Sequence, residues 1–401
     1  MLPSATVTSA APAATYRSVL RAPYATRLLL STLLGRLPSG MAPLAVVLAG
    51  ADRDSYGAAG VLAAVYLVAN AAGGPPLGRL ADRLGQPSVL TVSAVVASAS
   101  FGLLLADRTQ LLGAVVAGLA RPPLDATLRA TLPRLMPDRA HERVAFSLEA
   151  AAQELIYIVG PLLVAGLASL VSAQAALMAT AAAGLAGTLL VVSTPPARAF
   201  KPRPRAAGWL GPLRHRGLRR LYAAMACAAL PMGAIVPVAV SYAERLHAPT
   251  LAGLLPAVVS VGAVAGGLAY GTRSWPGSMP LQLTVLCAGW AAGWLPLLAI
   301  TGRASVVAAC LLPGVVMAPL LGTASLITAR LAPEGMATEA SALLVAALDV
   351  GCAMGTAAAV LPVGVWLLPA GGAAALALLI GPALRRPRLP QAAAPPVREA
   401  A

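Results

Sequence analysis

Twelve apolar segments, each about as long as a membrane-crossing helix, account for most of this sequence. A helix needs about 20 apolar residues to cross a bilayer. Hydrophobic residues make up 58% of the 401 residues and charged residues only 11%, which lies outside the range of soluble globular proteins. We therefore predict an all-α, polytopic membrane protein with twelve transmembrane helices. The predicted spans are 28–49, 57–77, 88–106, 110–133, 144–170, 175–193, 221–243, 250–271, 281–301, 304–329, 340–361 and 364–384.

The basic residues lie in blocks between these spans and produce a net charge of +15. In a soluble protein such a charge would suggest nucleic acid as a partner, but the distribution between apolar spans argues against one. Loops rich in arginine stay in the cytoplasm. With the N-terminus inside, the inner segments hold 22 basic residues and the outer loops hold 4. We predict a multi-pass plasma-membrane protein with both termini cytoplasmic.

A basic, proline-rich segment divides the spans into two groups of six. It predicts a cytoplasmic tail at 1–27, six-helix bundles at 28–193 and 221–384, a linker at 194–220 and a second tail at 385–401. A shift of 193 residues aligns short blocks of the first bundle with blocks of the second, which favours a duplication of six helices. The aligned blocks are Leu37-Pro38-x-Gly40 with Leu230-Pro231-x-Gly233, Ala59-Gly60 with Ala252-Gly253, and Gly73-Gly74-x-x-x-Gly78 with Gly266-Gly267-x-x-x-Gly271.

A short charged segment between the second and third spans carries the pattern Gly-x-x-x-Asp-Arg-x-Gly, made by Gly78, Asp82, Arg83 and Gly85. This pattern resembles the signature loop of the major facilitator superfamily of transporters. The resemblance implies two six-helix bundles that rock around a central cavity, and it implies that these four residues form a conformational gate. It also implies that Asp82 lies near the start of helix 11, with Arg129 of helix 4 as its partner and Thr338 as the helix cap.

Ionisable side chains inside membrane spans are costly and face the protein interior, so they are the candidate functional residues. The set comprises Arg36, Arg121, Asp125, Arg129, Glu149, Glu154 and Asp349. Counted from the span ends, Arg129 and Glu149 share a level near the inner surface, and Arg36, Arg121, Glu154 and Asp349 lie near the midplane. For Arg129, Asp125 and Glu149, ion pairs that hold helix 4 against helix 5 are as good an interpretation as a functional role.

Glu154 and Asp349 are the predicted proton carriers. They occupy similar depths in helices 5 and 11, which are equivalent in the repeat. A carboxyl group in a cavity of low dielectric constant holds its proton more tightly than in water, and a nearby arginine weakens that hold. A carboxyl group whose arginine partner moves between two conformations can therefore take up and release a proton. Arg36 and Arg121 are the arginines expected in the same cavity.

Two further features are similar to the drug:proton antiporters of that superfamily, namely Arg121 in helix 4 and Gly160-Pro161 in helix 5. The resemblance implies a secondary active transporter that exports a small amphipathic molecule against protons by alternating access. A nutrient uptake symporter or uniporter of the same fold is the alternative. The proton gradient is the expected energy source, no cofactor or metal is expected, and we expect a monomer.

An intramembrane enzyme or a receptor that does not transport is a weaker alternative. An enzyme would need histidines or a nucleophile within the spans, whereas His141, His215 and His247 fall in predicted loops. No GxxxxGK[ST] phosphate-binding loop occurs. The four cysteines lie far apart in apolar spans, so we interpret them as small core residues.

Overall fold

The structure, a computed structural model, describes residues 14–51, 56–106, 108–200, 211–248, 250–273, 275–299, 302–359 and 364–384. Helices are the regular structure of these residues, and they are joined by short turns. The elements are α1 (Tyr16–Arg21), α2 (Ala25–Ala51), α3 (Tyr56–Leu84), α4 (Gln86–Leu103), α5 (Gln110–Leu119), α6 (Leu124–Leu135), α7 (Arg139–Leu170), α8 (Ala173–Val192), α9 (Pro195–Arg198), η1 (Gly211–Arg214), α10 (Arg216–Arg245), α11 (Leu251–Gly271), α12 (Met279–Trp294), η2 (Leu295–Leu298), α13 (Arg303–Leu331), α14 (Ala337–Ala358), η3 (Gly364–Trp366) and α15 (Leu367–Leu384).

Eleven helical spans among the described residues are long and apolar enough to cross a membrane. The twelfth predicted span corresponds to α15, whose apolar stretch Leu367–Ile380 is shorter. Large apolar side chains such as Val68, Leu162 and Leu170 are exposed on the outside of the helices. An exposed apolar surface of this extent suits contact with lipid chains rather than water. The protein is an all-helical, polytopic membrane protein.

The fourth predicted span, at 110–133, is not one continuous helix. It consists of α5 and α6, which are separated at Arg121, Pro122 and Pro123. Neither proline has an N–H to donate to the preceding turn, so the α-helical ladder ends at this point. The interruption leaves Arg121 in non-helical backbone within the span.

The segment predicted as a charged loop, 78–85, is almost entirely helical. α3 continues through Gly78 and Asp82 to Leu84, and α4 starts at Gln86. Gly85 alone turns the chain, with a φ of 94°, a value that residues with a Cβ rarely adopt. Two other predicted boundaries also shift. α7 starts at Arg139, which puts His141 in its first turn, and α10 starts at Arg216, inside the predicted linker.

Glycines that the 193-residue shift aligns make the same kind of contact in both halves of the chain. A Cβ on Gly40 would collide with the carbonyl oxygen of Ile156 in α7, and a Cβ on Gly233 would collide with that of Cys352 in α14. Each glycine therefore allows two helix backbones to approach closely. The helices involved are the first and fifth spans of one half and the first and fifth spans of the other, as a duplication requires.

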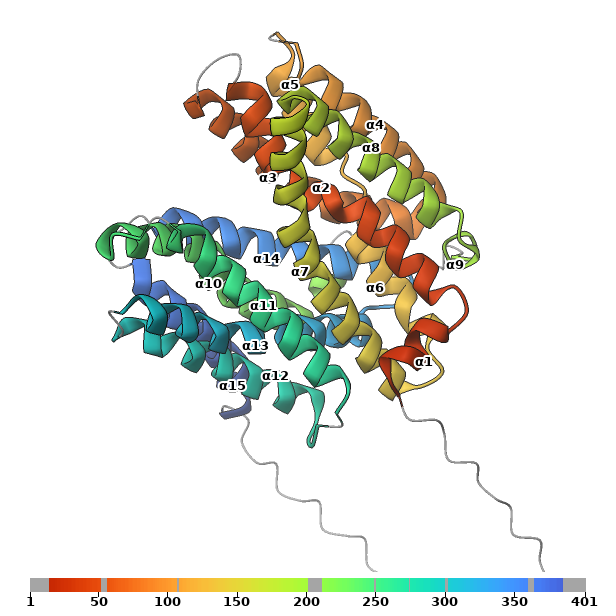
Figure 1. Cartoon of the computed structure of the whole chain (residues 1–401). Helices are drawn as coiled ribbons and strands as arrows, with labels where there is room; N and C mark the ends of the chain where they lie inside the picture. Colours follow the sequence, from red (N-terminus) through yellow and green to blue (C-terminus); the bar gives the residue numbers. More distant parts are fainter. Residues whose placement is uncertain are drawn as a thin grey trace, which may run out of the picture.

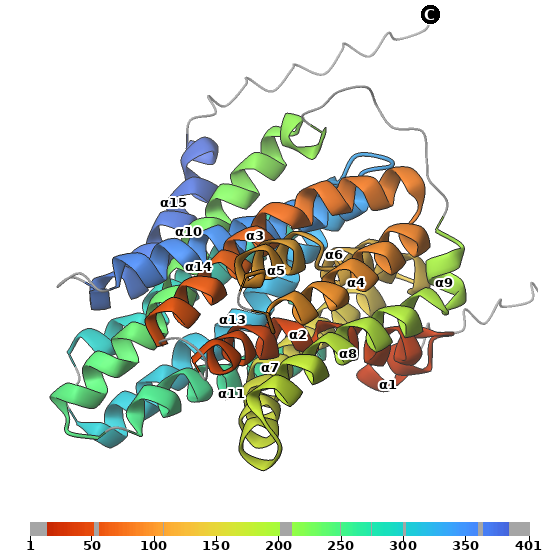
Figure 2. The same ribbon diagram turned by 90° about the horizontal axis from the view of Figure 1, so that it is seen from above.

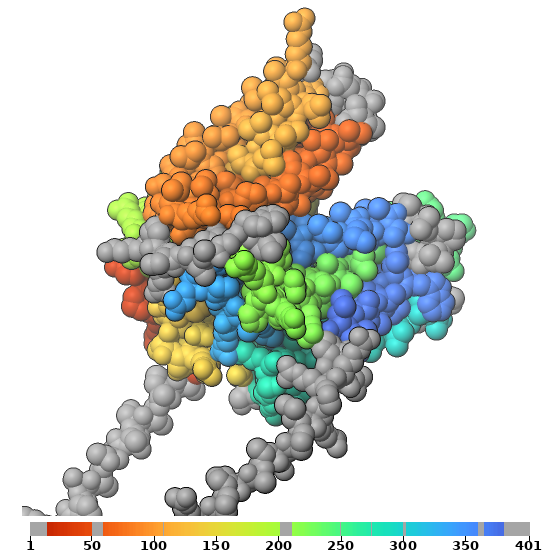
Figure 3. All heavy atoms as spheres, turned by 180° about the vertical axis from the view of Figure 1, so that it is seen from behind, coloured from red at the N-terminus to blue at the C-terminus, as the bar shows by residue number. Residues whose placement is uncertain are grey.

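The helices form two groups, α2–α8 (here called the N-terminal half) and α10–α15 (the C-terminal half), which diverge from a common junction (Figure 1). Contacts between the halves join α3 and α6 to α14, and α7 to α11 and α13. Figure 2 shows α3 lying along α14. Seen from behind, the arms formed by α3 and α14 separate toward their far ends (Figure 3). We call the end where they meet, with α1, Gly85 and the start of α14, the junction end.

Candidate functional site

Four of the predicted intramembrane charges form one buried network in the N-terminal half. Arg36 of α2 pairs with Asp125 of α6, and its Nη1 donates to Glu149 Oε1 of α7 at 2.8 Å. Arg129 of α6 lies 3.2 Å from the same oxygen through its Nη2. All four side chains are buried. A buried charge needs a partner because burial removes its water, and here each guanidinium has a carboxylate.

Gln153, one turn after Glu149 on α7, completes the network. Its Oε1 accepts from Arg36 Nη2 at 2.7 Å and from Arg129 Nη2 at 3.1 Å. The ion pairs expected between the fourth and fifth spans therefore exist, between α6 and α7, and the network extends to α2 as well. Arg36, predicted for the deep cavity, belongs to this network through Asp125, Glu149 and Gln153.

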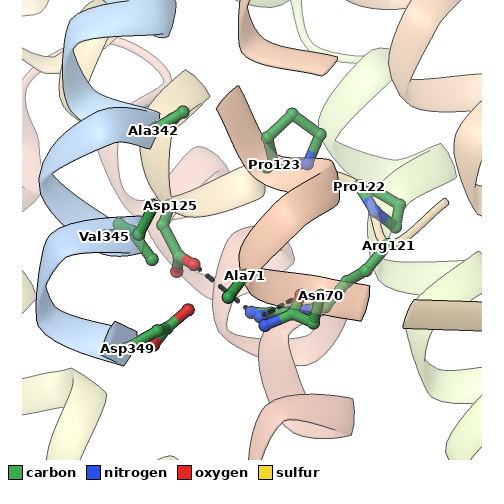
Figure 4. Close-up of a pocket in the computed structure, with 12 residues that line it drawn as sticks. Asn70, Ala71, Arg121, Pro122, Pro123, Asp125, Ala342, Val345 and Asp349 are labelled. Atoms are coloured by element: carbon green, nitrogen blue, oxygen red, sulfur yellow. Dashed lines mark hydrogen bonds and ion pairs between the residues drawn. The ribbon is translucent and has the colours of Figure 1, made fainter. Parts of the chain in front are cut away.

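Arg121 points away from the network core into the space between the halves. Its Nη1 donates to Asn70 Oδ1 of α3 at 3.0 Å, and its Nη2 donates to Ser39 Oγ of α2 at 2.6 Å. The same Nη2 lies 3.3 Å from Asp125 Oδ2 (Figure 4). Residues of α2, α3 and α6 therefore orient this guanidinium. Arg121 itself lies in the non-helical segment between α5 and α6.

A narrow pocket separates Arg121 from α14. Asn70, Arg121 and Asp125 lie on its N-terminal side, and Val345 and Asp349 lie on its C-terminal side. The carboxylate of Asp349 points toward Arg121 and Asp125 (Figure 4) and forms no hydrogen bond or ion pair with another described residue. The pocket measures about 20 Å³ in this state, which is room for one water molecule and not for an organic substrate.

Glu154 lies at the interface between the halves, apart from Asp349. It is 3% exposed, and its Oε2 accepts a hydrogen bond of 3.1 Å from Ser260 Oγ of α11. No arginine pairs with it among the described residues. The two predicted proton carriers are therefore both at the interface, but they have different surroundings. Asp349 faces Arg121, and Glu154 faces a neutral hydroxyl group of the opposite half.

At the junction end, Asp82 of α3 caps the N-terminus of α14. Its two carboxylate oxygens accept from the backbone N–H groups of Thr338 at 3.2 Å and Glu339 at 2.8 Å. The N-cap residue of α14, Met336, supplies no side-chain cap, so an aspartate from the other half replaces it. The expected contact between Asp82 and the start of the eleventh span, which is α14, is present. Arg129 pairs with Glu149 and not with Asp82. Thr338 is a donor in this cap and not the capping residue.

The remaining residues of the signature pattern contribute unequally. Gly78 packs against the first turns of α14, where a Cβ would press on the side chain of Ala342. Arg79, in the last turns of α3, donates to Glu339 Oε1 through Nε at 2.9 Å and through Nη2 at 2.7 Å, so it also joins α3 to α14. Arg83 is exposed and makes no hydrogen bond or ion pair with a described residue.

Two further contacts join the halves at the junction end. Arg330 of α13 lies 3.3 Å from Glu142 of α7. The hydroxyl group of Tyr16, in α1, donates to the carbonyl oxygens of Leu268 at 2.5 Å and Gly267 at 3.1 Å, near the end of α11. Burial raises the pKa of Tyr16 to about 12, so the hydroxyl group stays protonated and keeps donating at neutral pH.

The sequence interpretation missed the uncharged members of the site because it examined only ionisable residues. Asn70, Gln153, Ser39 and Ser260 are polar residues in apolar spans, and a search for all polar side chains in the spans would have found them. No group of three or more His, Cys, Asp or Glu side chains in the described part of the chain could hold a metal ion.

Comparisons with known proteins identify the family. The model of the Major Facilitator Superfamily matches residues 28–356. An uncharacterised MFS-type transporter of Sinorhizobium fredii, y4rN, is 29% identical over 326 residues, which cover 76% of this chain and 80% of that protein.

Solved structures share the fold at low sequence identity. The human organic anion transporter MFSD10 matches with a TM-score of 0.68 at 17% identity over 91% of this chain and 98% of its own. A bacterial homologue of the iron transporter ferroportin, in an outward-facing state, matches with a TM-score of 0.70 at 15% identity over 90% and 99%. The transporter FucP in its outward conformation matches with a TM-score of 0.68 at 14% identity over 88% and 97%. Because the family model extends from the first predicted span into the eleventh, this chain belongs to the major facilitator superfamily, whose members are membrane transporters and not enzymes.

Proposed function

We propose that this transporter exports a small amphipathic molecule in exchange for protons, by alternating access between its two halves. The observation that carries the proposal is the position of Glu154. It is a buried carboxyl group, it lacks an arginine partner among the described residues, and its hydrogen-bond donor, Ser260, belongs to the opposite half. When the halves separate at this level, that hydrogen bond is lost and water reaches the carboxyl group.

A proton carrier must bind its proton with different affinity in the two conformations. Hydration and hydrogen bonding set the proton affinity of a carboxyl group, and both change for Glu154 when the interface opens. Asp349 meets the same condition in another way, because its distance from Arg121 depends on how the halves pack. Export rather than uptake is supported by the similarity of Arg121 and Gly160-Pro161 to drug:proton antiporters.

Arg121, Asn70 and Asp349 are the proposed polar contacts of the substrate, and the apolar walls contributed by Val345 and Ala342 would cover its hydrophobic part. An organic anion transporter and a homologue of an iron transporter share this fold, so the fold does not select one substrate class. An uptake symporter or uniporter of the same fold is the second candidate, and the direction of coupled flux distinguishes it.

The junction end is the proposed cytoplasmic gate, with Gly78, Asp82, Arg83 and Gly85 as its signature residues and Arg129 acting indirectly through the buried network. The arginine-rich loops support this orientation, which places both termini in the cytoplasm and makes the present conformation outward-facing. We further propose that the protein works as a monomer in the plasma membrane, with bundles at 28–193 and 221–384.

The test uses purified protein in liposomes with an imposed pH gradient and a panel of fluorescent amphipathic dyes that are cationic, neutral or anionic. We expect at least one dye to move against the proton flux in the parent protein. Glu154→Gln should abolish the pH-driven movement but keep dye-for-dye exchange, which needs no net proton transfer. Glu244→Gln, at an exposed carboxylate at the end of α10, is the matched control and should keep both activities.

Two outcomes would contradict the proposal. If Glu154→Gln and Asp349→Asn both retain pH-driven movement, the carboxyl groups are structural and protons are not coupled through them. If the dye instead moves with the protons, the protein is an uptake symporter. Exchange activity in each variant shows that the protein is folded, so loss of coupling cannot be confused with loss of structure.

A further inference from the structure

A hollow of about 670 Å³ lies at the junction end, away from the interface between the halves. One wall is formed by residues of α1 and the turns on either side of it, and the other by residues 134–137, at and after the end of α6, together with His141 in the first turn of α7. Figure 1 shows α1 beside these ends of α6 and α7. The volume falls within the range of about 300–1,000 Å³ that is typical of sites for small molecules.

The lining of the hollow is basic. Arg17 and Arg21 of α1, Arg134 of α6 and His141 of α7 line it, and no acidic side chain does. Arg17 and Arg21 are four residues apart, so they project from one face of α1. Both are exposed, and neither forms a hydrogen bond or an ion pair with a described residue. The guanidinium of Arg134 lies over the ring of Phe200, at 4.4 Å from its centroid.

The acid nearest to His141, Asp138, is already engaged. Its Oδ1 accepts from the backbone N–H groups of Ala140 and His141 and lies 2.9 Å from His141 Nδ1. The hydrogen bonds from His141 hold the pKa of Asp138 below its usual range, so it remains a carboxylate that caps α7. Its partners are Ala140 and His141, and it forms no ion pair with Arg17 or Arg21.

A general excess of arginine in the loops explains how many there are, but not why they converge on one hollow. The guanidinium groups of Arg17 and Arg21, at the edge of a concave site, favour a ligand with several anionic oxygens, since arginine donates two hydrogen bonds to such a group. Exposed apolar and aromatic side chains next to Arg17 and Arg21 indicate that the ligand also has an apolar part. Leu20 and Tyr24, on or next to α1, are 41% and 48% exposed. Tyrosine and apolar residues in such positions are typical of the membrane–water interface.

We propose that this hollow binds the phosphate-bearing headgroup of an anionic phospholipid, with Arg17 and Arg21 as the principal contacts. The acyl chains leave the hollow along Leu20 and Tyr24. Basic pockets at the ends of transmembrane helices recognise anionic headgroups through the same combination of charge and adjacent apolar surface. The lipid thereby anchors α1, which also bridges to α11 through Tyr16.

The transported substrate is a less suitable occupant. Arg134 lies nine residues after Asp125 on α6, about 14 Å farther along the helix at about 1.5 Å per residue, so the hollow is distinct from the pocket at Arg121. The site therefore does not depend on the proposed transport function, and its test does not use transport.

Native mass spectrometry of the full chain in detergent, with phosphatidylglycerol or phosphatidylcholine added, tests the site. We expect one tightly bound phosphatidylglycerol in the parent and binding about 30-fold weaker in the double variant Arg17→Gln/Arg21→Gln. That change corresponds to about 2 kcal/mol, or about 1 kcal/mol for each basic residue. The matched control is Arg219→Gln/Arg220→Gln, which removes two exposed arginines at the start of α10 and should bind as the parent does.

Four results would overturn the proposal. Phosphatidylglycerol could bind equally to the parent and the double variant. The control could lose binding to the same extent as the double variant, which would mean that total positive charge, and not this hollow, determines binding. Phosphatidylcholine could bind as tightly as phosphatidylglycerol, or excess inorganic phosphate could displace the lipid completely, which would make free phosphate the ligand. Arg17→Lys/Arg21→Lys keeps both charges but not the paired hydrogen bonds, so it should bind more tightly than the glutamine variant and less tightly than the parent, which guards against misfolding as the cause of loss.

Discussion

Replacing Asp82 with asparagine should weaken the contact between α3 and α14 at the junction end and favour the conformation in which this end is open. The carboxylate is 3% exposed and accepts from two backbone N–H groups of α14, at 3.2 and 2.8 Å. An amide at this position keeps one acceptor oxygen, so one of the two N–H groups loses its partner. The negative charge that complements the helix N-terminus is lost as well.

The size of the effect follows from these contacts. A hydrogen bond to a charged group contributes about 1.5–3 kcal/mol, and the retained amide oxygen recovers part of it. We expect Asp82→Asn to weaken the contact between the halves by about 2 kcal/mol, which changes the ratio of open to closed junction by about 30-fold. This contact joins α3 to α14, so its loss should affect the conformational equilibrium more than the stability of either half.

The assay is the labelling rate of a reporter cysteine at Ser147, a buried residue of α7 close to Gly271 of α11, in a protein whose four natural cysteines are replaced. A membrane-impermeant maleimide should react about 30-fold faster in Asp82→Asn. Asp138→Asn is the matched control, because Asp138 also caps a helix N-terminus, but the helix is α7, which follows it directly in the chain. An unchanged rate in Asp82→Asn, or an equal increase in both variants, would refute the reasoning.

Three further predictions concern stability and the α1 contact. Glu149→Gln should lower the free energy of unfolding by about 3 kcal/mol, because buried Arg129 loses its carboxylate and Arg36 keeps only Asp125. Glu142→Gln removes a partly exposed pair and should cost less than about 1 kcal/mol. Both are measured by unfolding in dodecyl sulfate micelles, and equal losses would contradict the buried network. Gly233→Ala should cost about 2 kcal/mol in the same assay, whereas Gly253→Ala should cost nothing, since no atom lies within 4 Å of its added Cβ. Tyr16→Phe should raise the reporter labelling rate about 5-fold, for a hydrogen bond of about 1 kcal/mol. The pKa of Tyr16 is raised from about 10 to about 12, so its contribution is fully present below pH 10 and is lost as the pH rises through 12. A Tyr16→Phe effect that varies between acidic and neutral pH would argue against this hydroxyl group as the donor.

The membrane-spanning helices could be read from the sequence because an apolar segment of sufficient length has one stable form in a bilayer, a helix that satisfies its own backbone hydrogen bonds. The interruption at Arg121 was not predicted, although Pro122 and Pro123 marked it. Hydrophobic length predicts one helix for this span, whereas the two adjacent prolines remove N–H donors that a continuous helix needs. Charge predicts a loop at 78–85, but α3 extends beyond the apolar region to Leu84.

The candidate residues were found individually, whereas their pairing was not. Arg36 and Glu149 are 113 residues apart, and depth in the span does not show that they pair. Asp82 was expected to meet Arg129, but Arg129 lies among the buried carboxylates of its own half. Depth along a helix can be counted in a sequence, but the direction in which a side chain points around the helix depends on which neighbour packs there.

The sequence by itself determined that this chain spans a membrane many times, that short glycine-containing blocks recur 193 residues apart, and which ionisable residues lie inside the spans. These are properties of segments, set by hydrophobic length and residue spacing. Only the tertiary structure decided that Glu149 pairs with two arginines, that Glu154 accepts a hydrogen bond from Ser260 across the interface, and that Asp82 caps a helix of the other half. These contacts depend on distances between residues far apart in the chain, and burial makes each charged partner matter because no water replaces it.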